Sequence, residues 1–307
     1  IYAADPANFT SGTITINGGI VTANGGDGAG IGGGIDGAGG TITINGGIVT
    51  ANGSGGAGIG GGAGGAGGEI TINGGTVTAT GGTGDAGIGG GRDGAGGTIT
   101  INGGHVIANG SQGDQYFYCA GIGGGFGREG GSITINGGVV EAHGGWTGIG
   151  SGENGSSGTA TGECAVTVTG GVVTATGDNS AGIGGTFTTG NNGNAVIIAD
   201  GKDDNEISDD GNTTSWSGVI FQDTTGQVYG SNVTPTENFE IPEGYTLTIG
   251  NGTTLTIPEG VTLTNNGTII VENGGTLMNN GTIVDNGTIN GTCLLYTSPS
   301  PRDYAAS

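Results

Sequence analysis

The chain contains few of the residues on which many protein functions depend. It has 4 Lys and Arg residues, 3 Cys, 6 Pro and 5% aromatic residues among 307 positions. Because 26 Asp and Glu oppose so few cations, the formal net charge is −22. Such a chain cannot neutralise phosphates, so we expect no nucleic-acid partner and no attachment to anionic membranes. No apolar run is long enough to span a bilayer, which predicts no membrane insertion.

Glycine, by contrast, supplies 82 residues. Glycine without a pattern is typical of disorder, but here it separates short β-branched runs at regular intervals. Three segments recur as a set six times, starting with Thr13–Gly19, Ile20–Asn24 and Ala29–Gly34. The first segment returns at steps of 28, 28, 29, 34 and 33 residues, beginning at Thr41, Glu69, Thr98, Ser132 and Ala165. A fixed long period indicates a repeat architecture.

Three alternating segments joined by Gly-rich corners predict one coil of a right-handed parallel β-helix. This is an all-β β-solenoid with three short strands per coil. Alternation places Ile14, Ile16 and Ala23 inside, and stacking places like residues over like residues about 4.8 Å apart. At one corner we expect a left-handed asparagine in five of the six coils, hydrogen-bonded to the next coil: Asn17, Asn45, Asn73, Asn102 and Asn136.

The sequence predicts four parts. Residues 1–186 form a six-coil β-helix with 28–34-residue repeats, and 187–237 form irregular transition coils with an acidic loop. Residues 238–292 form a β-solenoid with shorter strand units of 6–8 residues. The segment Cys293–Asp303 interrupts this repeat and resembles a translated sequencing adapter, so 293–307 is expected to be a non-native tail. We expect the remainder to be an internal fragment of a larger protein.

The TITINGG and AGIGGG units, with IPEG and LTNNG in the later repeats, resemble repeats of very large secreted surface proteins of anaerobic gut bacteria. The resemblance covers almost the whole native chain. It implies an extracellular location on the bacterial cell surface and an adhesin-like or carbohydrate-binding role, without defining a ligand. Pectate-lyase-type enzymes and some cellulose-binding modules share the architecture, but the fold alone does not transfer an activity.

The residues give little support to an enzyme. A β-helix lyase needs a basic residue, and before the tail the chain offers only Arg92, Arg128 and Lys202. Each arginine precedes an acid, which we interpret as an exposed ion pair that contributes little. His105 and His143 lie four positions apart along neighbouring strands, about 13 Å, which is too far to share a metal. We therefore expect a non-enzymatic protein without a cofactor.

Calcium is the exception that the sequence leaves open. Weak candidate ligands crowd one loop: Asp203, Asp204, Asp209 and Asp210. Further aspartates occupy Gly-rich corners, namely Asp27, Asp36, Asp85, Asp93 and Asp114. Neither group has the spacing of a known calcium loop, so solvated surface acids are the alternative interpretation.

The aromatic residues suggest a ligand site. An insertion, Ser111–Tyr118, occupies a corner of the fourth coil, and Trp146 lies at the same corner of the next coil. Exposed aromatic rings on a rigid scaffold suit stacking against sugar rings. The predicted glycan platform consists of Tyr116, Phe117, Tyr118, Trp146, His143 and Asp114. The alternative is that the loop folds back and covers apolar surface with its own rings.

Two faces and two cysteines complete the predictions. Outward threonines form two rows of the kind found on ice-binding solenoids, although exposed strands favour threonine in any case. The third face is expected to be bare, because the glycines that point outward are Gly30, Gly32, Gly58, Gly60, Gly87 and Gly89. Such a face would permit lateral self-packing of solenoids. Cys119 and Cys164 lie at different corners, which predicts two free, mostly buried thiols.

We therefore expect a non-enzymatic extracellular repeat segment of a bacterial surface protein, acting as a rigid stalk or adhesin with glycan binding. Its partners would be polysaccharides or glycans of host or bacterial surfaces. The alternative is a dedicated polysaccharide-binding module of a carbohydrate-degrading system. An ice-binding solenoid and a β-helix polysaccharide lyase are less favoured.

Overall fold

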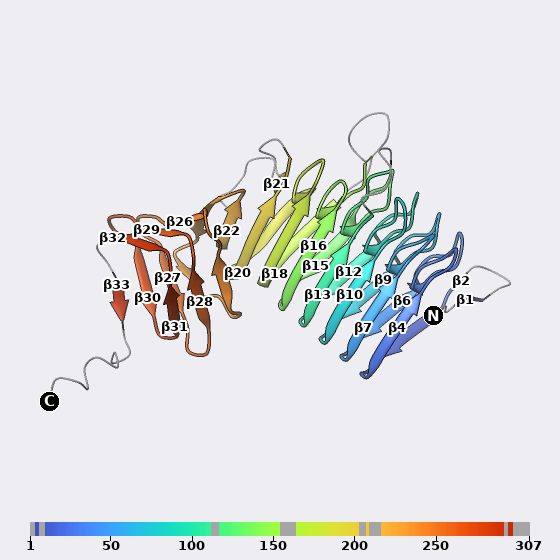
Figure 1. Ribbon diagram of the computed structural model, residues 1–307, viewed down its shortest axis with the longest axis horizontal. Coiled ribbons are helices and arrows are strands. Elements are labelled where there is room, and N and C mark those ends of the chain that lie inside the picture. Colours follow the sequence, from blue (N-terminus) through green and yellow to red (C-terminus); the bar gives the residue numbers. More distant parts are fainter. Residues whose placement is uncertain are drawn as a thin grey trace. The chain divides into compact units, whose positions relative to one another are not determined.

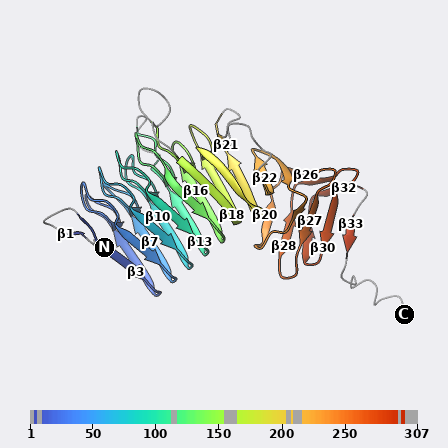
Figure 2. The same ribbon diagram turned by 180° about the vertical axis from the view of Figure 1, so that it is seen from behind.

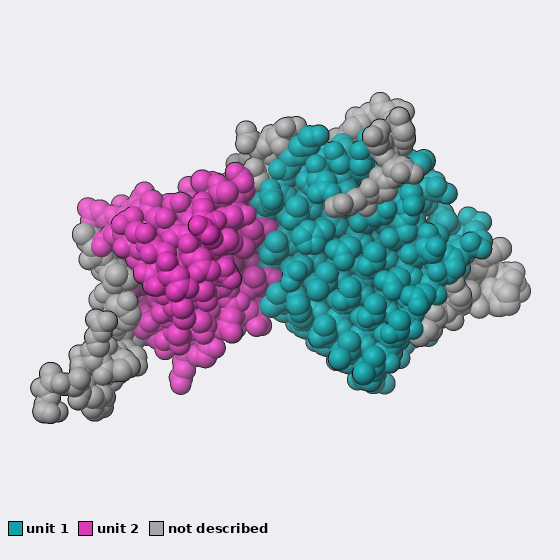
Figure 3. Space-filling view, viewed as in Figure 1, with its two compact units in different colours: residues 1–168, 173–188, 199–212 teal, residues 169–172, 189–198, 213–307 magenta. Residues whose placement is uncertain are grey.

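The computed structural model describes residues 4–5, 10–111, 117–153, 164–202, 207–208, 216–291 and 294–296. In this part of the chain every regular element is a strand, and no helix long and apolar enough to cross a membrane occurs. The chain forms two compact units (Figure 3). Unit 1 comprises residues 1–168, 173–188 and 199–212, and unit 2 comprises 169–172, 189–198 and 213–307.

Unit 1 repeats a coil of three strands, the first being β3 (Thr13–Ile16), β4 (Ile20–Asn24) and β5 (Ile31–Gly32). The next four coils are β6 (Thr41–Ile44), β7 (Ile48–Asn52) and β8 (Ile59–Gly60); β9 (Glu69–Ile72), β10 (Thr76–Thr80) and β11 (Ile88–Gly89); β12 (Thr98–Ile101), β13 (His105–Asn109) and β14 (Ile122–Gly123); and β15 (Gly131–Ile135), β16 (Val139–Gly144) and β17 (Ile149–Gly150). Two longer strands follow, β18 (Cys164–Gly177) and β20 (Thr186–Asp200), whose residues 169–172 and 189–198 belong to unit 2. Each is followed by a short strand, β19 (Ile183–Gly184) and β21 (Ile207–Ser208). A short antiparallel pair, β1 (Ala4–Asp5) and β2 (Thr10–Ser11), precedes them.

Each strand of a coil pairs in parallel with the equivalent strand of the next coil, without a register shift. Thr13 lies beside Thr41, Ile20 beside Ile48 and Ile31 beside Ile59. The third strands form one seven-stranded parallel sheet from β5 to β21. Figures 1 and 2 show the strands of unit 1 stacked one coil after another. The predicted parallel β-helix with three strands per coil is confirmed.

The core of unit 1 is a set of aliphatic columns. In the second coil Ile42, Ile44, Ala51 and Ile59 are fully buried, and Val49 is nearly so. Alternation along each strand turns these residues inward and the threonines outward. Because each inward residue stacks on its equivalents above and below, its burial depends on the neighbouring coils.

The third strand is an inner layer and not a bare outer face. All six glycines that were expected to point outward are buried. A Cβ on Gly30 would lie 2.8 Å from the backbone nitrogen of Asn52, and one on Gly39 would overlap the carbonyl of Gly67. The prediction that these glycines face solvent is wrong, because the backbone of the neighbouring coil occupies the space beside them. Whether copies of the chain pack side by side stays a prediction, but these glycines do not supply the surface for it.

The asparagine corner is partly as predicted. Each amide donates to the Oδ1 of the preceding asparagine at 2.8 Å, which forms a ladder through Asn17, Asn45, Asn73, Asn102 and Asn136. None of these residues has a positive φ. The left-handed position lies two residues later, at Gly19 and its equivalents, because glycine adopts that conformation without steric cost.

After the segments 169–172 and 189–198, unit 2 continues with an antiparallel hairpin, β22 (Gly218–Gln222) and β23 (Thr225–Tyr229). The following strands are β24 (Asn232–Val233), β25 (Phe239–Ile241), β26 (Thr246–Ile249), β27 (Thr254–Ile257), β28 (Thr262–Asn265), β29 (Thr268–Val271), β30 (Thr276–Asn279), β31 (Thr282–Asp285), β32 (Thr288–Gly291) and β33 (Leu294–Tyr296). They stack in three parallel ladders: β23–β26–β29–β32, β24–β27–β30–β33 and β25–β28–β31. Their inward leucines, isoleucines and valines form the core of this unit, with Phe221 beside them.

Candidate functional site

The predicted glycan platform lies on loops between the second and third strands of neighbouring coils. Tyr116 and Asp114 fall outside the described residues. Phe117, Tyr118 and Trp146 are described, and each is partly buried. The three rings do not form one open surface, because they belong to two separate aromatic contacts.

Tyr118 and Trp146 make the first contact. Their ring centroids are 6.4 Å apart and their planes differ by 23°, so the rings are nearly parallel. The two loops are joined by the backbone N–H of Trp146, which donates to the backbone carbonyl of Cys119 at 3.0 Å. His143, at the end of β16, is also partly buried. Since both rings keep part of their surface in solvent, this pair retains the chemistry of a sugar-stacking site.

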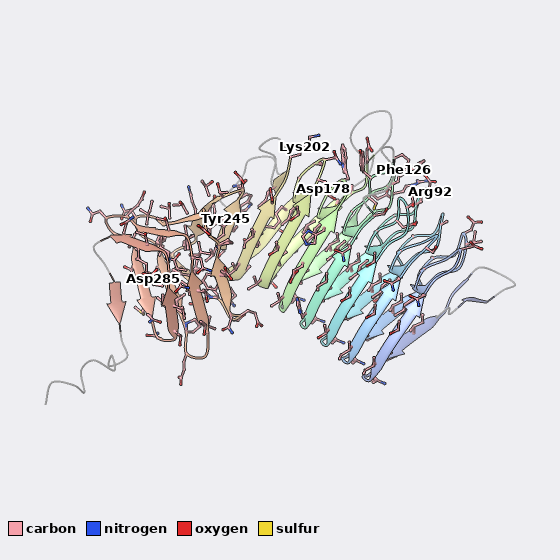
Figure 4. All side chains as sticks on the ribbon, in the orientation of Figure 1. Arg92, Phe126, Asp178, Lys202, Tyr245 and Asp285 are labelled. Carbon is pink, nitrogen blue, oxygen red and sulfur yellow. The ribbon has the colours of Figure 1, made fainter. Side chains whose placement is uncertain are left out.

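Phe117 makes the second contact and is occupied by its own chain. Its ring meets Phe126 edge to face at 5.0 Å, and the Arg92 guanidinium lies 5.6 Å from its centroid. Figure 4 shows Arg92 and Phe126 close together on the loops of adjacent coils. Their loops are paired, since the N–H of Asp93 donates to the carbonyl of Phe126 at 3.1 Å. The Phe117 ring therefore packs against side chains of its own chain, as the alternative interpretation expects.

The arginines do not form the expected ion pairs. Neither Arg92 with Asp93 nor Arg128 with Glu129 is paired in the described part of the chain. There the one ion pair found joins His105 Nε2 to Glu141 Oε1 at 3.0 Å, across two neighbouring coils. Both of its side chains are exposed, so it contributes little to stability.

From the sequence, Asp85 is interpreted as a calcium ligand or a solvated surface acid, but the structure shows that it is buried. Asp85 is 2% exposed, and its Oδ1 accepts a hydrogen bond from the backbone N–H of Arg92. Burial raises the pKa of Asp85 from 3.8 to about 6, against the lowering effects of that hydrogen bond and of the Arg92 charge. The residue immediately before the third segment occupies this position in every coil: Gly28, Gly56, Asp85, Cys119, Trp146 and Ser180. Aligning the repeats on that column is the signal that identifies Asp85 as different from its neighbours.

Cys119 and Cys164 do not have the properties of reactive thiols. Both are free and buried, as predicted. The Cys119 Sγ donates to the carbonyls of Asp85 (3.0 Å) and Ser111 (3.3 Å). Burial, and then the charge of Asp85, raise the pKa of Cys119 to about 12, and burial raises the pKa of Cys164 to about 11. Neither thiol therefore has the low pKa of a reactive cysteine.

The calcium candidates receive a different explanation where they are described. Asp36 and Asp93 have φ values of 56° and 62°, and Gly64 and Gly127 occupy the equivalent turn with φ values of 77° and 81°. This turn needs a residue that tolerates the left-handed conformation, which accounts for aspartate and glycine there. Among the described residues no group of three or more His, Cys, Asp and Glu could hold a metal ion. Asp203, Asp204, Asp209 and Asp210 lie outside the described part.

The threonine rows are in register but uneven. One row is continuous through Thr15, Thr43, Thr71, Thr100, Thr134 and Thr167. The other row, which starts with Thr13 and Thr41, contains Glu69, Ser132 and Ala165 in later coils. Ice binding requires a regular flat array, and this face offers one complete row of threonines.

Comparison with known proteins agrees with the architecture. The beta helix repeat family matches six successive segments: residues 14–35, 42–63, 70–92, 99–126, 133–153 and 166–187. Each of the first five matches covers the three strands of one coil, and the sixth covers most of β18 together with β19. No curated protein and no solved structure shows significant similarity to the chain. The repeat matches and the stacked parallel strands together show that these six segments are coils of a parallel β-helix.

Proposed function

We propose that the chain is a non-enzymatic, rigid stalk segment of an extracellular bacterial surface protein. The observation that carries this proposal is the unbroken register of the five coils from β3 to β17, in which each coil pairs with the next through all three strands. A ladder of this kind resists bending because each coil is fixed at three sides. The strongly acidic composition favours a soluble, well-hydrated surface.

Hydrogen exchange of the full chain tests the stalk role. Strand amides of β6 to β16 should all exchange slowly and over a similar range of rates, because opening one coil exposes its neighbours. Exchange of several adjacent coils within seconds, in a protein that is folded by circular dichroism, would contradict a rigid segment.

Glycan binding at the Tyr118–Trp146 pair is the second candidate function. It is favoured by the near-parallel stacking of two partly exposed rings on fixed loops. A stalk that carries such a site would act as an adhesin, whereas a module whose main role is this site would serve a carbohydrate-degrading system.

A pull-down of the full chain on insoluble cellulose, xylan, pectin and mucin tests the glycan role. Binding should be lost in a Tyr118→Ala/Trp146→Ala double variant and kept in a Phe126→Leu control, whose ring contacts Phe117. Retention of both variants on one matrix would place binding elsewhere. If the folded protein binds none of the matrices, the stalk alone remains.

A further inference from the structure

Unit 2 contains a hollow that none of the aromatic or acidic motifs indicates. It has a volume of about 270 Å³ and lies on the outer face of the hairpin β22–β23 and the adjoining strand β26. That volume is slightly below the range of about 300–1,000 Å³ typical of small-molecule sites. It is therefore suited to a single small ring.

The lining combines an apolar floor with polar walls. Ile220 is 1% exposed and forms part of the floor. Amide groups come from Gln222 and Gln227, and hydroxyl groups come from Thr225, Tyr229, Thr246 and Thr248. Cross-strand pairing fixes their positions, because Ile220 lies opposite Gln227 and Thr248 lies beside Gln227.

Two contacts fix the position of the Tyr229 side chain, one with Trp216 and one with Gln222. The ring of Trp216, which is 5% exposed, meets the Tyr229 ring edge to face at 5.3 Å. The hydroxyl group of Tyr229 is hydrogen-bonded to the side chain of Gln222 on the other strand of the hairpin. Burial raises the pKa of Tyr229 above its ordinary value of 10, although the Gln222 hydrogen bond opposes this. The phenol therefore keeps its proton at neutral pH and can both donate and accept.

On the opposite face of the same strands, glycine and phenylalanine fill the core. The Phe221 ring lies where a Cβ on Gly226 would be, and it meets the Tyr245 ring edge to face at 5.8 Å. The sheet beneath the hollow is thus packed on its inner side, and the polar side chains of its outer side are left for a ligand.

The chemistry of the lining selects a ligand class. None of the lining residues is charged, so a phosphate or carboxylate would find no cation there. An apolar ligand would deprive the Gln227 amide and the hydroxyl groups of Thr246 and Thr248 of the hydrogen bonds that water gives them. A neutral sugar has an apolar face of C–H groups and a rim of hydroxyl groups, which match the partly exposed Tyr229 ring and the polar side chains of the lining. We infer that this hollow binds one neutral sugar residue, at a site separate from the Tyr118–Trp146 pair.

Saturation-transfer NMR with methyl glycosides of glucose, galactose, mannose and xylose, and with a methyl glucuronide, tests the inference on the full chain. At least one neutral glycoside should bind with a millimolar Kd. The glucuronide should bind at least about tenfold more weakly, because it meets an acidic protein without a cation in the hollow. Transfer to none of the neutral glycosides would overturn the inference.

Matched variants localise the binding. A Gln227→Ala/Thr248→Val double variant should weaken it by at least about tenfold, since an amide and a hydroxyl group are lost. Thr256→Val is the control, because Thr256 occupies the same place in an identical TLTI strand outside the hollow. Binding that survives the double variant, or that is lost only in Tyr118→Ala/Trp146→Ala, would overturn the inference. The second result would instead support glycan binding at the Tyr118–Trp146 pair.

Discussion

At the scale of single residues, Asp85 makes the free energy of unfolding depend on pH. Its folded-state pKa of about 6 lies above the ordinary 3.8, so the folded state holds the proton more tightly than the unfolded chain. This contribution to stability is complete below about pH 3.8 and is lost as the pH rises to about 6. One pKa unit corresponds to about 1.4 kcal/mol, so the loss is on the order of 2–3 kcal/mol.

Asp85→Asn should remove this pH dependence while keeping an acceptor for the Arg92 N–H. Chemical denaturation at pH 4 and pH 7.5 measures the effect, and the variant should be the more stable protein at pH 7.5. Asp93→Asn is the control, because Asp93 is exposed and asparagine also tolerates its left-handed φ of 62°. Equal pH dependence in wild type and Asp85→Asn would show that Asp85 is not the responsible group.

Glycine positions of the inner layer should be intolerant of any side chain. Gly60 has a φ of +136°, and a Cβ there would overlap the carbonyl of Gly89. Gly60→Ala should therefore lower the free energy of unfolding by more than about 3 kcal/mol. Gly18→Ala, where no heavy atom lies within 4 Å of the added Cβ, should change it by less than about 1 kcal/mol. Similar stabilities for the two variants would contradict the tight inner layer.

The cysteines offer a third test at this scale. Because Cys119 and Cys164 are buried with raised pKa values, iodoacetamide at pH 8 should leave both unlabelled in the native protein. Peptide mapping should find both labelled after denaturation. Rapid native labelling of either residue would indicate that its coil opens.

At the scale of strands and corners, each hydrogen bond of the asparagine ladder should add a similar amount to the free energy of unfolding. Asn73 takes part in two side-chain hydrogen bonds of the ladder, whereas Asn17 takes part in one. At about 0.5–1.5 kcal/mol for each hydrogen bond, Asn73→Ala should cost about twice as much as Asn17→Ala. Equal costs, measured by chemical denaturation, would mean that the ladder adds little.

Strands and their register could be predicted from the sequence because the repeat places identical residues in contact. The Ile14–Ile42 and Thr13–Thr41 pairs follow directly from the alignment of copies. The burial of Gly30 could not, because a glycine gives no sign of which side its missing side chain would face. The same holds for the Asn17 corner, where the amide ladder was predictable but the left-handed conformation belongs to Gly19.

The candidate sites were less accessible to sequence reasoning. Tyr118 and Trp146 could be brought together from their shared place in the repeat, but the contact of Phe117 with Arg92 depends on loop conformation. The hollow beside Gln227 requires the antiparallel pairing of β22 with β23. Among the described strands no other antiparallel pair repeats the sequence of that hairpin, so no internal alignment indicates it.

At the scale of the whole molecule, the coils of the β-helix are stable only as a stack. A single coil buries too little apolar surface to fold alone, and each inward column of isoleucine and alanine is completed by its neighbours. Rigidity along the stack is the property that a stalk requires, and it is also what fixes the aromatic loops in place.

The most direct test of this claim is the distribution of distances within unit 1. Spin labels at Thr22 and Thr174, with Cys293 replaced, lie on outward positions five coil steps apart, which corresponds to about 24 Å at 4.8 Å per step. Double electron–electron resonance should give one narrow distribution, centred near that value after allowance for the label arms. A broad distribution extending over tens of ångströms would contradict a rigid stack of coils.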